Sequence, residues 1–147
     1  MLLVEQLAQL GDGDAVHDWW RRWQERLAAQ GEPTATVLAR LRAANPAIVP
    51  RNVVGHSDVA PQRKIDPGML FPWKTLAEAG VGIFPRNAAR SLDGDVQTAL
   101  QRFGYEAGAE SVKAFQRHFR PGKVDGVADP ETRALLAALL DQVGGKA

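Results

Sequence analysis

The sequence predicts a mostly helical chain made of two parts, one at residues 1–84 and a small three-helix unit at residues 92–147. Two observations predict this organisation. Apolar side chains recur at helical spacing between glycine and proline breaks in both parts. The pattern changes at Pro85-Arg86-Asn87, so residues 85–91 are expected to form a linker. One short apolar run, Val53-Val54, instead has the character of a strand.

Three helices are predicted before residue 45. The first, at residues 2–10, has leucines near helical spacing and ends at Gly11-Asp12-Gly13. The second extends from Asp14 to about residue 30, and its apolar stripe consists of Trp19, Trp20, Trp23 and Leu27. Thr34 is a suitable N-cap for the third helix, which should close before Asn45-Pro46 because a residue before proline disfavours the helical conformation.

Residues 51–54 are predicted to form a short strand that leads into a loop at residues 55–68. Pro72 stands at the first position of a short helix, Trp73 to Ala79, which Gly80 stops. In the second part, Asp93 or Asp95 caps a helix that closes at Gly104. A second helix stops at Pro121-Gly122, and Asp129-Pro130 opens the last one. Their apolar faces carry Val96, Leu100, Phe103, Val112, Phe115, Phe119, Leu135, Leu136, Leu139 and Leu140.

Composition narrows the possible functions. The formal net charge of +1 gives no electrostatic reason to bind nucleic acid or an anionic membrane. The chain has no cysteine, so any metal must be bound by His, Asp or Glu. No segment approaches a transmembrane span, and residues 1–5 lack the basic region of a signal peptide.

The loop at residues 55–68 holds the most informative chemistry. His56 and Asp66 are potential ligands of a borderline metal such as zinc, and Lys64 between them is a potential electrophile. Loops fixed at the ends of regular elements are common positions for catalytic groups. The alternative is an ordinary loop histidine and a turn-forming Asp-Pro-Gly.

Two stretches resemble one family. Residues 52–68, with the sequence NVVGHSDVAPQRKIDPG, and the following Leu70-Phe71-Pro72-Trp73 closely resemble the C-terminal part of type-2 N-acetylmuramoyl-L-alanine amidases. These are zinc amidases related to peptidoglycan-recognition proteins. Residues 96–105, 114–121 and 125–132 look like the helical peptidoglycan-binding module appended to some of them. That domain order is similar to cell-envelope members of the family, including periplasmic lipoproteins.

The resemblance implies an α/β mixed-sheet amidase fold, incomplete here, at residues 1–84, with a divergent helical stretch at 1–44, and an all-α peptidoglycan-binding domain at 92–147. It also implies that His56 and Asp66 are two of three protein ligands of Zn²⁺. Zinc would activate water and polarise the amide carbonyl between N-acetylmuramic acid and L-alanine, and Lys64 would stabilise the oxyanion. The implied partners are peptidoglycan or muropeptides, and the implied location is the cell envelope or periplasm.

The chain departs from the family in the residues before His56. The family's first zinc histidine lies about a hundred residues before the second, and its general-base glutamate lies on a central strand, whereas only 55 residues precede His56. His17 lies on a Trp-rich helix, and we do not assign it the missing ligand role. Glu5, Glu25 and Glu32 have no matching context. The chain therefore resembles the C-terminal part of an amidase that is truncated at its N-terminus.

Several residues have more than one interpretation. Asp58 is a candidate for orienting the His56 imidazole, or else a solvated carboxylate or helix cap. His118 is expected to be structural or a surface group, with a sugar contact left open. Tyr105, Asp125 and Gly126 are the candidates for peptidoglycan contact, by resemblance alone, and a purely structural appendage is the alternative.

The leading prediction is a zinc-dependent amidase. A non-catalytic fragment that binds the cell wall is the main alternative. A helical interaction protein that uses the Trp stripe is a third.

Overall fold

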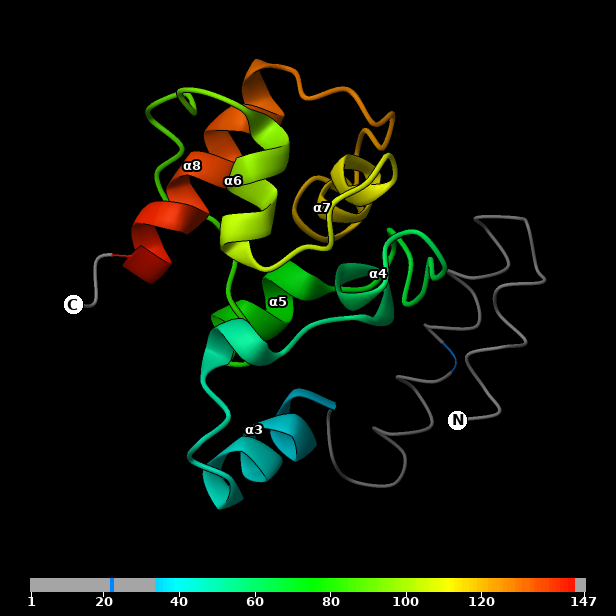
Figure 1. Cartoon of the computed structure of the whole chain (residues 1–147). Helices are drawn as coiled ribbons and strands as arrows, with labels where there is room; N and C mark the ends of the chain where they lie inside the picture. The colour runs from blue at the N-terminus through cyan, green and yellow to red at the C-terminus, as the bar shows by residue number, and fades with distance from the viewer. Residues whose placement is uncertain (1–21, 23–33, 145–147) are drawn as a thin grey trace. The chain divides into compact units, whose positions relative to one another are not determined.

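The computed structural model describes residue 22 and residues 34–144 (Figure 1). Every regular element in these residues is helical. The elements are α3 (Thr34–Ala44), the 3-10 helix η1 (Pro50–Asn52), α4 (His56–Val59), α5 (Trp73–Glu78), α6 (Val96–Phe103), α7 (Ser111–Phe119) and α8 (Pro130–Gly144). The expected helical character is therefore confirmed for this part of the chain. Of the two helices predicted before residue 31, only Arg22 is described, and it is helical; the Trp stripe and His17 lie outside the described residues.

The predicted strand at residues 51–54 is wrong. Pro50 fixes a backbone angle that suits a helical turn, and the Val53 N–H donates to the Pro50 carbonyl at 3.1 Å. The chain therefore turns at Pro50–Asn52 before it reaches the two valines. No strand occurs among residues 34–144, so the mixed sheet implied by the resemblance is not seen there.

The described residues form two compact units that are each discontinuous in sequence. The first contains the chain up to Val53 and Leu70–Ile83, and the second contains Val54–Met69 together with the chain from Phe84 onward. Residues 54–69, which we call the motif loop, therefore share a unit with the three C-terminal helices. This packing groups residues differently from the predicted boundaries at 84 and 92, which stay a prediction.

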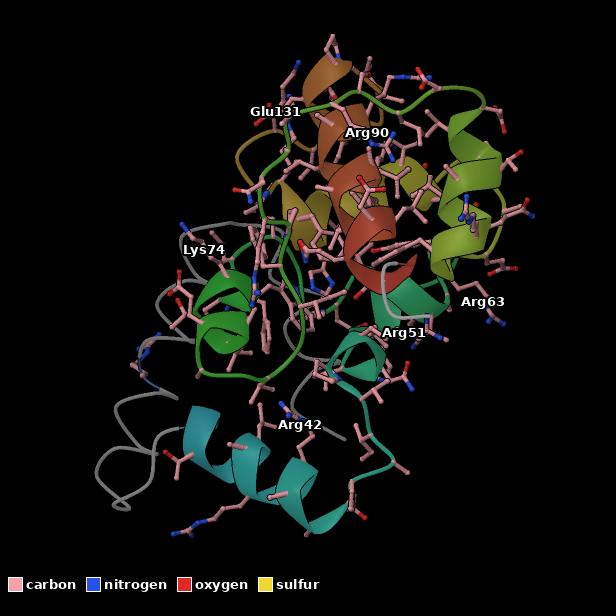
Figure 2. The ribbon with its side chains drawn as sticks, turned by 90° about the vertical axis from the view of Figure 1, so that its left-hand side faces the viewer. Arg42, Arg51, Arg63, Lys74, Arg90 and Glu131 are labelled. Atoms are coloured by element: carbon pink, nitrogen blue, oxygen red, sulfur yellow. The ribbon has the colours of Figure 1, made fainter. Side chains whose placement is uncertain are left out.

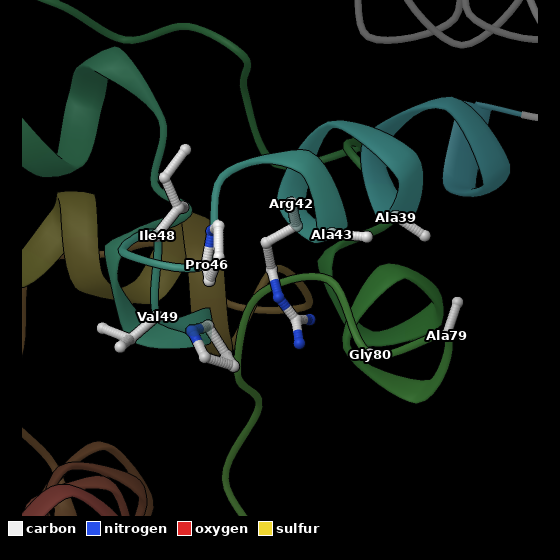
Figure 3. A pocket seen from close by; sticks show the side chains of 9 residues that line it. Ala39, Arg42, Ala43, Pro46, Ile48, Val49, Ala79 and Gly80 are labelled. Atoms are coloured by element: carbon white, nitrogen blue, oxygen red, sulfur yellow. The ribbon is translucent and has the colours of Figure 1, made fainter.

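The first unit consists of α3, the turn at η1 and α5. Among the described residues of this unit, the buried apolar side chains are Trp73, Leu76 and Val81. An open cavity of about 460 Å³ lies between α3, residues 46–50 and the end of α5, and the Arg42 side chain extends into it beside Gly80 (Figure 3). Leu41 of α3 is exposed.

In the second unit, α6, α7 and α8 pack around one apolar core. Leu100, Phe115, Leu136 and Leu139 are completely or almost completely buried, and each such side chain contributes about 1.5–3 kcal/mol of burial free energy. Phe119 links the aromatic members of this core, because its ring contacts those of Phe84, Phe103 and Phe115. The three helices therefore form a compact core against which other segments of this unit pack.

The ends of these helices follow the predicted local chemistry. Asp95 accepts a hydrogen bond from the Thr98 N–H at 2.7 Å and caps α6, which ends at Gly104 with a positive φ of 127°. Asp129 accepts from the Thr132 N–H at 3.0 Å and caps α8, whose first residue is Pro130.

The segment before α6 is tied to α8. The Arg90 side chain, labelled in Figure 2, donates two hydrogen bonds to the Asp141 carboxylate. The Gln142 side chain hydrogen-bonds the Phe84 carbonyl and the Arg86 N–H. None of the helices in the described ranges combines the length and apolarity needed to cross a bilayer.

Candidate functional site

The motif loop brings two of the predicted site residues together. The His56 Nδ1 atom lies 2.5 Å from the Asp66 Oδ2 atom. The Ser57 N–H donates to the Asp66 carbonyl at 2.9 Å, so the backbone also closes the loop at this point. The His56 side chain is 63% exposed, and an exposed pair of this kind contributes about 0–1 kcal/mol to stability. We call His56 and Asp66 the ligand pair, after the metal-ligand role that the resemblance predicts for them.

Lys64 lies on the same loop, between the two members of the ligand pair. Its side chain is exposed, and its backbone N–H donates to the Ala60 carbonyl at 3.0 Å. The neighbouring Arg63 extends into solvent (Figure 2). The loop therefore presents an imidazole, a carboxylate and two cationic side chains at the surface of its unit.

Asp58 is buried and belongs to a different set of contacts. Its Oδ2 accepts from the Gly55 N–H at 2.8 Å, which caps α4, and lies 2.7 Å from the His118 Nδ1. Its Oδ1 accepts from the Tyr105 hydroxyl at 2.6 Å. The helix-cap interpretation of Asp58 thus fits the structure, with two further contacts to the C-terminal helices.

The Asp58–His118 pair differs from the ligand pair in its environment. The two side chains are 6% and 3% exposed. Removing one partner from a buried pair typically costs about 3–5 kcal/mol, because the other group is then left buried without compensation. The Asp58–His118 pair consequently stabilises the fold. In the ligand pair the Asp66 side chain is 17% exposed, and only the His56 imidazole is largely open to solvent.

Tyr105 also belongs to the buried contacts around Asp58. It is 5% exposed and packs edge-on against the Phe115 ring. Burial, the negative charge of Asp58 and the hydrogen bond to Asp58 raise the pKa of Tyr105 well above its usual value. Its prediction as a surface contact for peptidoglycan does not match this position, because the phenol is directed into the unit.

Asp125 and Gly126 form a tight loop after α7. The Asp125 Oδ1 accepts from the Val127 N–H at 2.9 Å and from the Gln116 side chain at 3.1 Å, and Lys123 lies 3.3 Å from its Oδ2. These contacts lower the pKa of Asp125, the Val127 bond most of all. Gln116 is fully buried and also accepts from the backbone N–H groups of Asp125 and Gly126. The loop is therefore shaped by its own contacts with α7.

Sequence reasoning missed the partners of Asp58. His118 follows Val112 and Phe115 at helical spacing, so its burial on the apolar face of α7 could have been predicted. Its pairing with a residue 60 positions earlier could not. Gln62 was also missed, although its side chain contacts the Ser111 hydroxyl and the Glu110 N–H, both at 3.4 Å.

The potential for metal binding rests on the ligand pair. Imidazole nitrogen and carboxylate oxygen are suitable zinc ligands, and here the His56 Nδ1 and the Asp66 Oδ2 are in direct hydrogen-bond contact with each other. In the part of the chain that the structure describes, no three His, Asp or Glu side chains are placed so that they could hold a metal ion together. Those residues therefore fit two positions of a zinc site and do not complete it.

Part of the second unit matches a known protein family, and a longer part of the chain is similar to known proteins. The family of peptidoglycan binding domains matches residues 93–136. N-acetylmuramoyl-L-alanine amidase AmiD of Escherichia coli is 43% identical over 117 residues, which cover 66% of this chain and 42% of that protein. This chain therefore spans less than half the length of that relative.

Solved structures give the same result. AmiD of E. coli, in complex with the substrate anhydro-N-acetylmuramic acid-L-Ala-D-gamma-Glu-L-Lys, superimposes with a TM-score of 0.66 at 38% identity, over 75% of this chain and 50% of that one. AmpDh3 of Pseudomonas aeruginosa superimposes with a TM-score of 0.68 at 35% identity, over 75% of this chain and 51% of that one. The resemblance inferred from the two sequence stretches is confirmed by these similarities.

The chain is also similar in sequence to a protein whose name is not that of an amidase. Protein nucleotidyltransferase YdiU of Rhodopseudomonas palustris is 33% identical over 85 residues, which cover 52% of this chain and 17% of that protein.

Proposed function

We propose that this chain, a relative of the N-acetylmuramoyl-L-alanine amidases, acts in the hydrolysis of the amide between N-acetylmuramic acid and L-alanine in peptidoglycan. The observation that carries the proposal is the 2.5 Å contact between the His56 Nδ1 and the Asp66 Oδ2. The loop that bears both residues belongs to the same compact unit as the residues that match a peptidoglycan binding domain. In this proposal His56 and Asp66 are zinc ligands, and peptidoglycan or muropeptides are the substrates.

Lys64 is proposed to stabilise the charge that develops on the carbonyl oxygen during attack. Its exposed ammonium group lies on the loop that bears the ligand pair, and it needs no proton transfer to act as a fixed positive charge. Lys64→Ala should therefore reduce the rate of stem-peptide release while zinc binding stays as in the unchanged chain.

The finer fold and location are part of the same proposal. Residues 1–84 are proposed to derive from the mixed-sheet amidase domain, with a divergent stretch at 1–44, and residues 92–147 to be the peptidoglycan-binding domain. The Asp125-Gly126 loop is the proposed contact with peptidoglycan. The proposed location is the cell envelope or periplasm, because that is where peptidoglycan is found.

Zinc titration of the full chain tests the ligand pair. We expect one zinc ion per chain and an affinity that falls by at least about tenfold in His56→Ala and in Asp66→Asn. Glu78→Gln changes an exposed carboxylate of the first unit and serves as the matched control, with unchanged affinity. Equal affinity in all four proteins would reject His56 and Asp66 as ligands.

Hydrolysis is tested on muropeptides with zinc at saturation. The expected product is free stem peptide, detected by mass spectrometry, and its release should be lost in His56→Ala. If zinc binds and no stem peptide appears, this chain is not an amidase by itself.

Cell-wall binding without hydrolysis is the second candidate. It is favoured because the matched domain at 93–136 has a complete core, whereas residues 34–144 supply only two ligands. It predicts that the full chain sediments with insoluble peptidoglycan and that His56→Ala sediments equally. Removal of residues 92–147 should abolish sedimentation, and retention of the shortened chain would exclude the domain as the binding part.

A further inference from the structure

We infer that Tyr105 and His118 of the C-terminal helices are positioning residues for the ligand pair and act on it through Asp58. The inference rests on the proposed function, since it assigns a role in the geometry of that site. It makes the peptidoglycan binding domain a structural part of the site as well as a binding unit. None of the three residues contacts a substrate in this role.

Side chains of the C-terminal helices hold the Asp58 carboxylate. The Tyr105 hydroxyl and the His118 imidazole reach the two oxygens of the carboxylate at 2.6 and 2.7 Å. All three side chains are at most 6% exposed. A buried carboxylate is held where its partners are, because water does not replace a lost hydrogen bond there. The place of Asp58 is thus set by residues 47 and 60 positions later in the chain.

Asp58 in turn holds the start of α4, the helix that begins at His56. The oxygen that contacts His118 also accepts the Gly55 N–H at 2.8 Å, and Gly55 is the N-cap of α4. His56 is the first residue of this four-residue helix. A helix this short is not stable alone, so its orientation depends on the contacts at its start. The carboxylate therefore fixes the backbone from which the imidazole extends.

A backbone hydrogen bond connects α4 to Asp66. Ser57, the residue between His56 and Asp58, is buried and donates its backbone N–H to the Asp66 carbonyl at 2.9 Å. The side of the loop that bears Asp66 is in this way attached to the same helical turn. Gln62 adds a weaker second contact, to Ser111 and Glu110 at the start of α7.

Two matched substitutions of His118 separate positioning from packing. Leucine and asparagine side chains both branch at Cγ into two terminal heavy atoms, and only asparagine keeps a hydrogen-bond donor near the position of Nδ1. We expect His118→Leu to raise amide hydrogen exchange in residues 55–58 by about tenfold and His118→Asn to restore most of the protection. Tyr105→Phe removes one donor with almost no change of shape and should raise exchange in the same segment.

Zinc affinity is the second readout and uses the metal alone. His118→Leu and Tyr105→Phe should bind zinc more weakly than the unchanged chain, and His118→Asn should recover most of the affinity. Arg90→Ala, which removes an exposed ion pair in the same unit, is the control and should leave both exchange at 55–58 and zinc binding unchanged.

Two results would overturn the inference. One is unchanged exchange in residues 55–58 in both His118→Leu and Tyr105→Phe. The other is an equal effect of leucine and asparagine at position 118. If His118→Leu fails to fold, Tyr105→Phe and His118→Asn decide the question. Hydrogen exchange is measured without metal or substrate, so it does not depend on hydrolysis. Accelerated exchange in the variants, together with no release of stem peptide by the unchanged chain, would reject the hydrolase proposal and retain the positioning role.

Discussion

At the scale of single residues, the motif loop separates an exposed chemical group from its buried support. The ligand pair and Lys64 are at the surface, where they contribute little to stability, and Asp58 is buried two residues after His56. Adjacent positions in one short motif thus have opposite environments. A substitution at Asp58 is expected to act on stability first, whereas one at His56 is expected to act on chemistry.

Tyr105 provides a direct optical test of this burial, because it is the only tyrosine in the chain. Its pKa is raised by burial and by Asp58, so the folded protein keeps the phenol protonated where an unfolded chain loses the proton. Stability is therefore complete below the ordinary pKa of about 10 and decreases as the pH rises above it. Phenolate absorbance should remain low above pH 10 until the protein unfolds.

Tyr105→Phe removes this proton linkage, and the stability of that variant should change less with pH above 10. A phenolate that forms with the ordinary pKa while the circular dichroism stays native would show that Tyr105 is accessible to water.

The site residues differ in how far sequence could predict them. His56, Lys64 and Asp66 lie within eleven consecutive residues, so their shared role is legible in one motif. The contacts of Asp58 depend on α6 and α7 packing beside the loop, and no local pattern encodes a pairing across 47 or 60 residues. The resemblance makes Tyr105 a candidate for peptidoglycan contact, and its motif gives no information on which way the side chain is directed.

At the scale of elements, capping residues determined which predictions were correct. As predicted, α6 is capped by Asp95 and ends before Gly104. As also predicted, α8 begins at Pro130 after its cap Asp129. These predictions are correct because a cap acts on the nearest turn. The strand at 51–54 was predicted from two valines, and the tertiary environment did not supply a neighbouring strand. Pro50 instead begins a turn.

Asp129 makes the start of α8 sensitive to acid. The Thr132 N–H, and then Thr132 Oγ1, Arg120 and Lys123, hold the pKa of Asp129 far below its usual value. A lowered pKa in the folded state stabilises the protein above the unfolded value of about 3.9, and this contribution is lost as the pH falls further. Urea unfolding should therefore show stability that declines below about pH 4.

Asp129→Asn should be less stable at neutral pH and should show a flatter decline in acid. Glu106→Gln, at an exposed position, is the control and should follow the unchanged chain. The same slope in Asp129→Asn and the unchanged chain would show that other carboxylates dominate the acid response.

At the scale of the whole molecule, the division into units predicts how the chain opens. Because residues 54–69 share a compact unit with residues 84–144, we expect the amides of Ser57 and Ala60 to exchange through the same opening event as those of α7. Hydrogen exchange at increasing, sub-denaturing urea measures this as a common dependence on denaturant. Ser57 and Ala60 opening with a much smaller urea dependence than α7 would show that the loop detaches alone.

The Asp58 contacts also have a consequence for the order in which the chain assembles. α6 and α7 are separated only by residues 104–110, whereas the bonds of Asp58 close chain segments of 47 and 60 residues. Closing longer segments costs more entropy and slows folding. During synthesis the motif loop leaves the ribosome before Tyr105 and His118 exist as a folded surface. His56 and Asp66 should therefore reach their final geometry only after the helices translated last have packed.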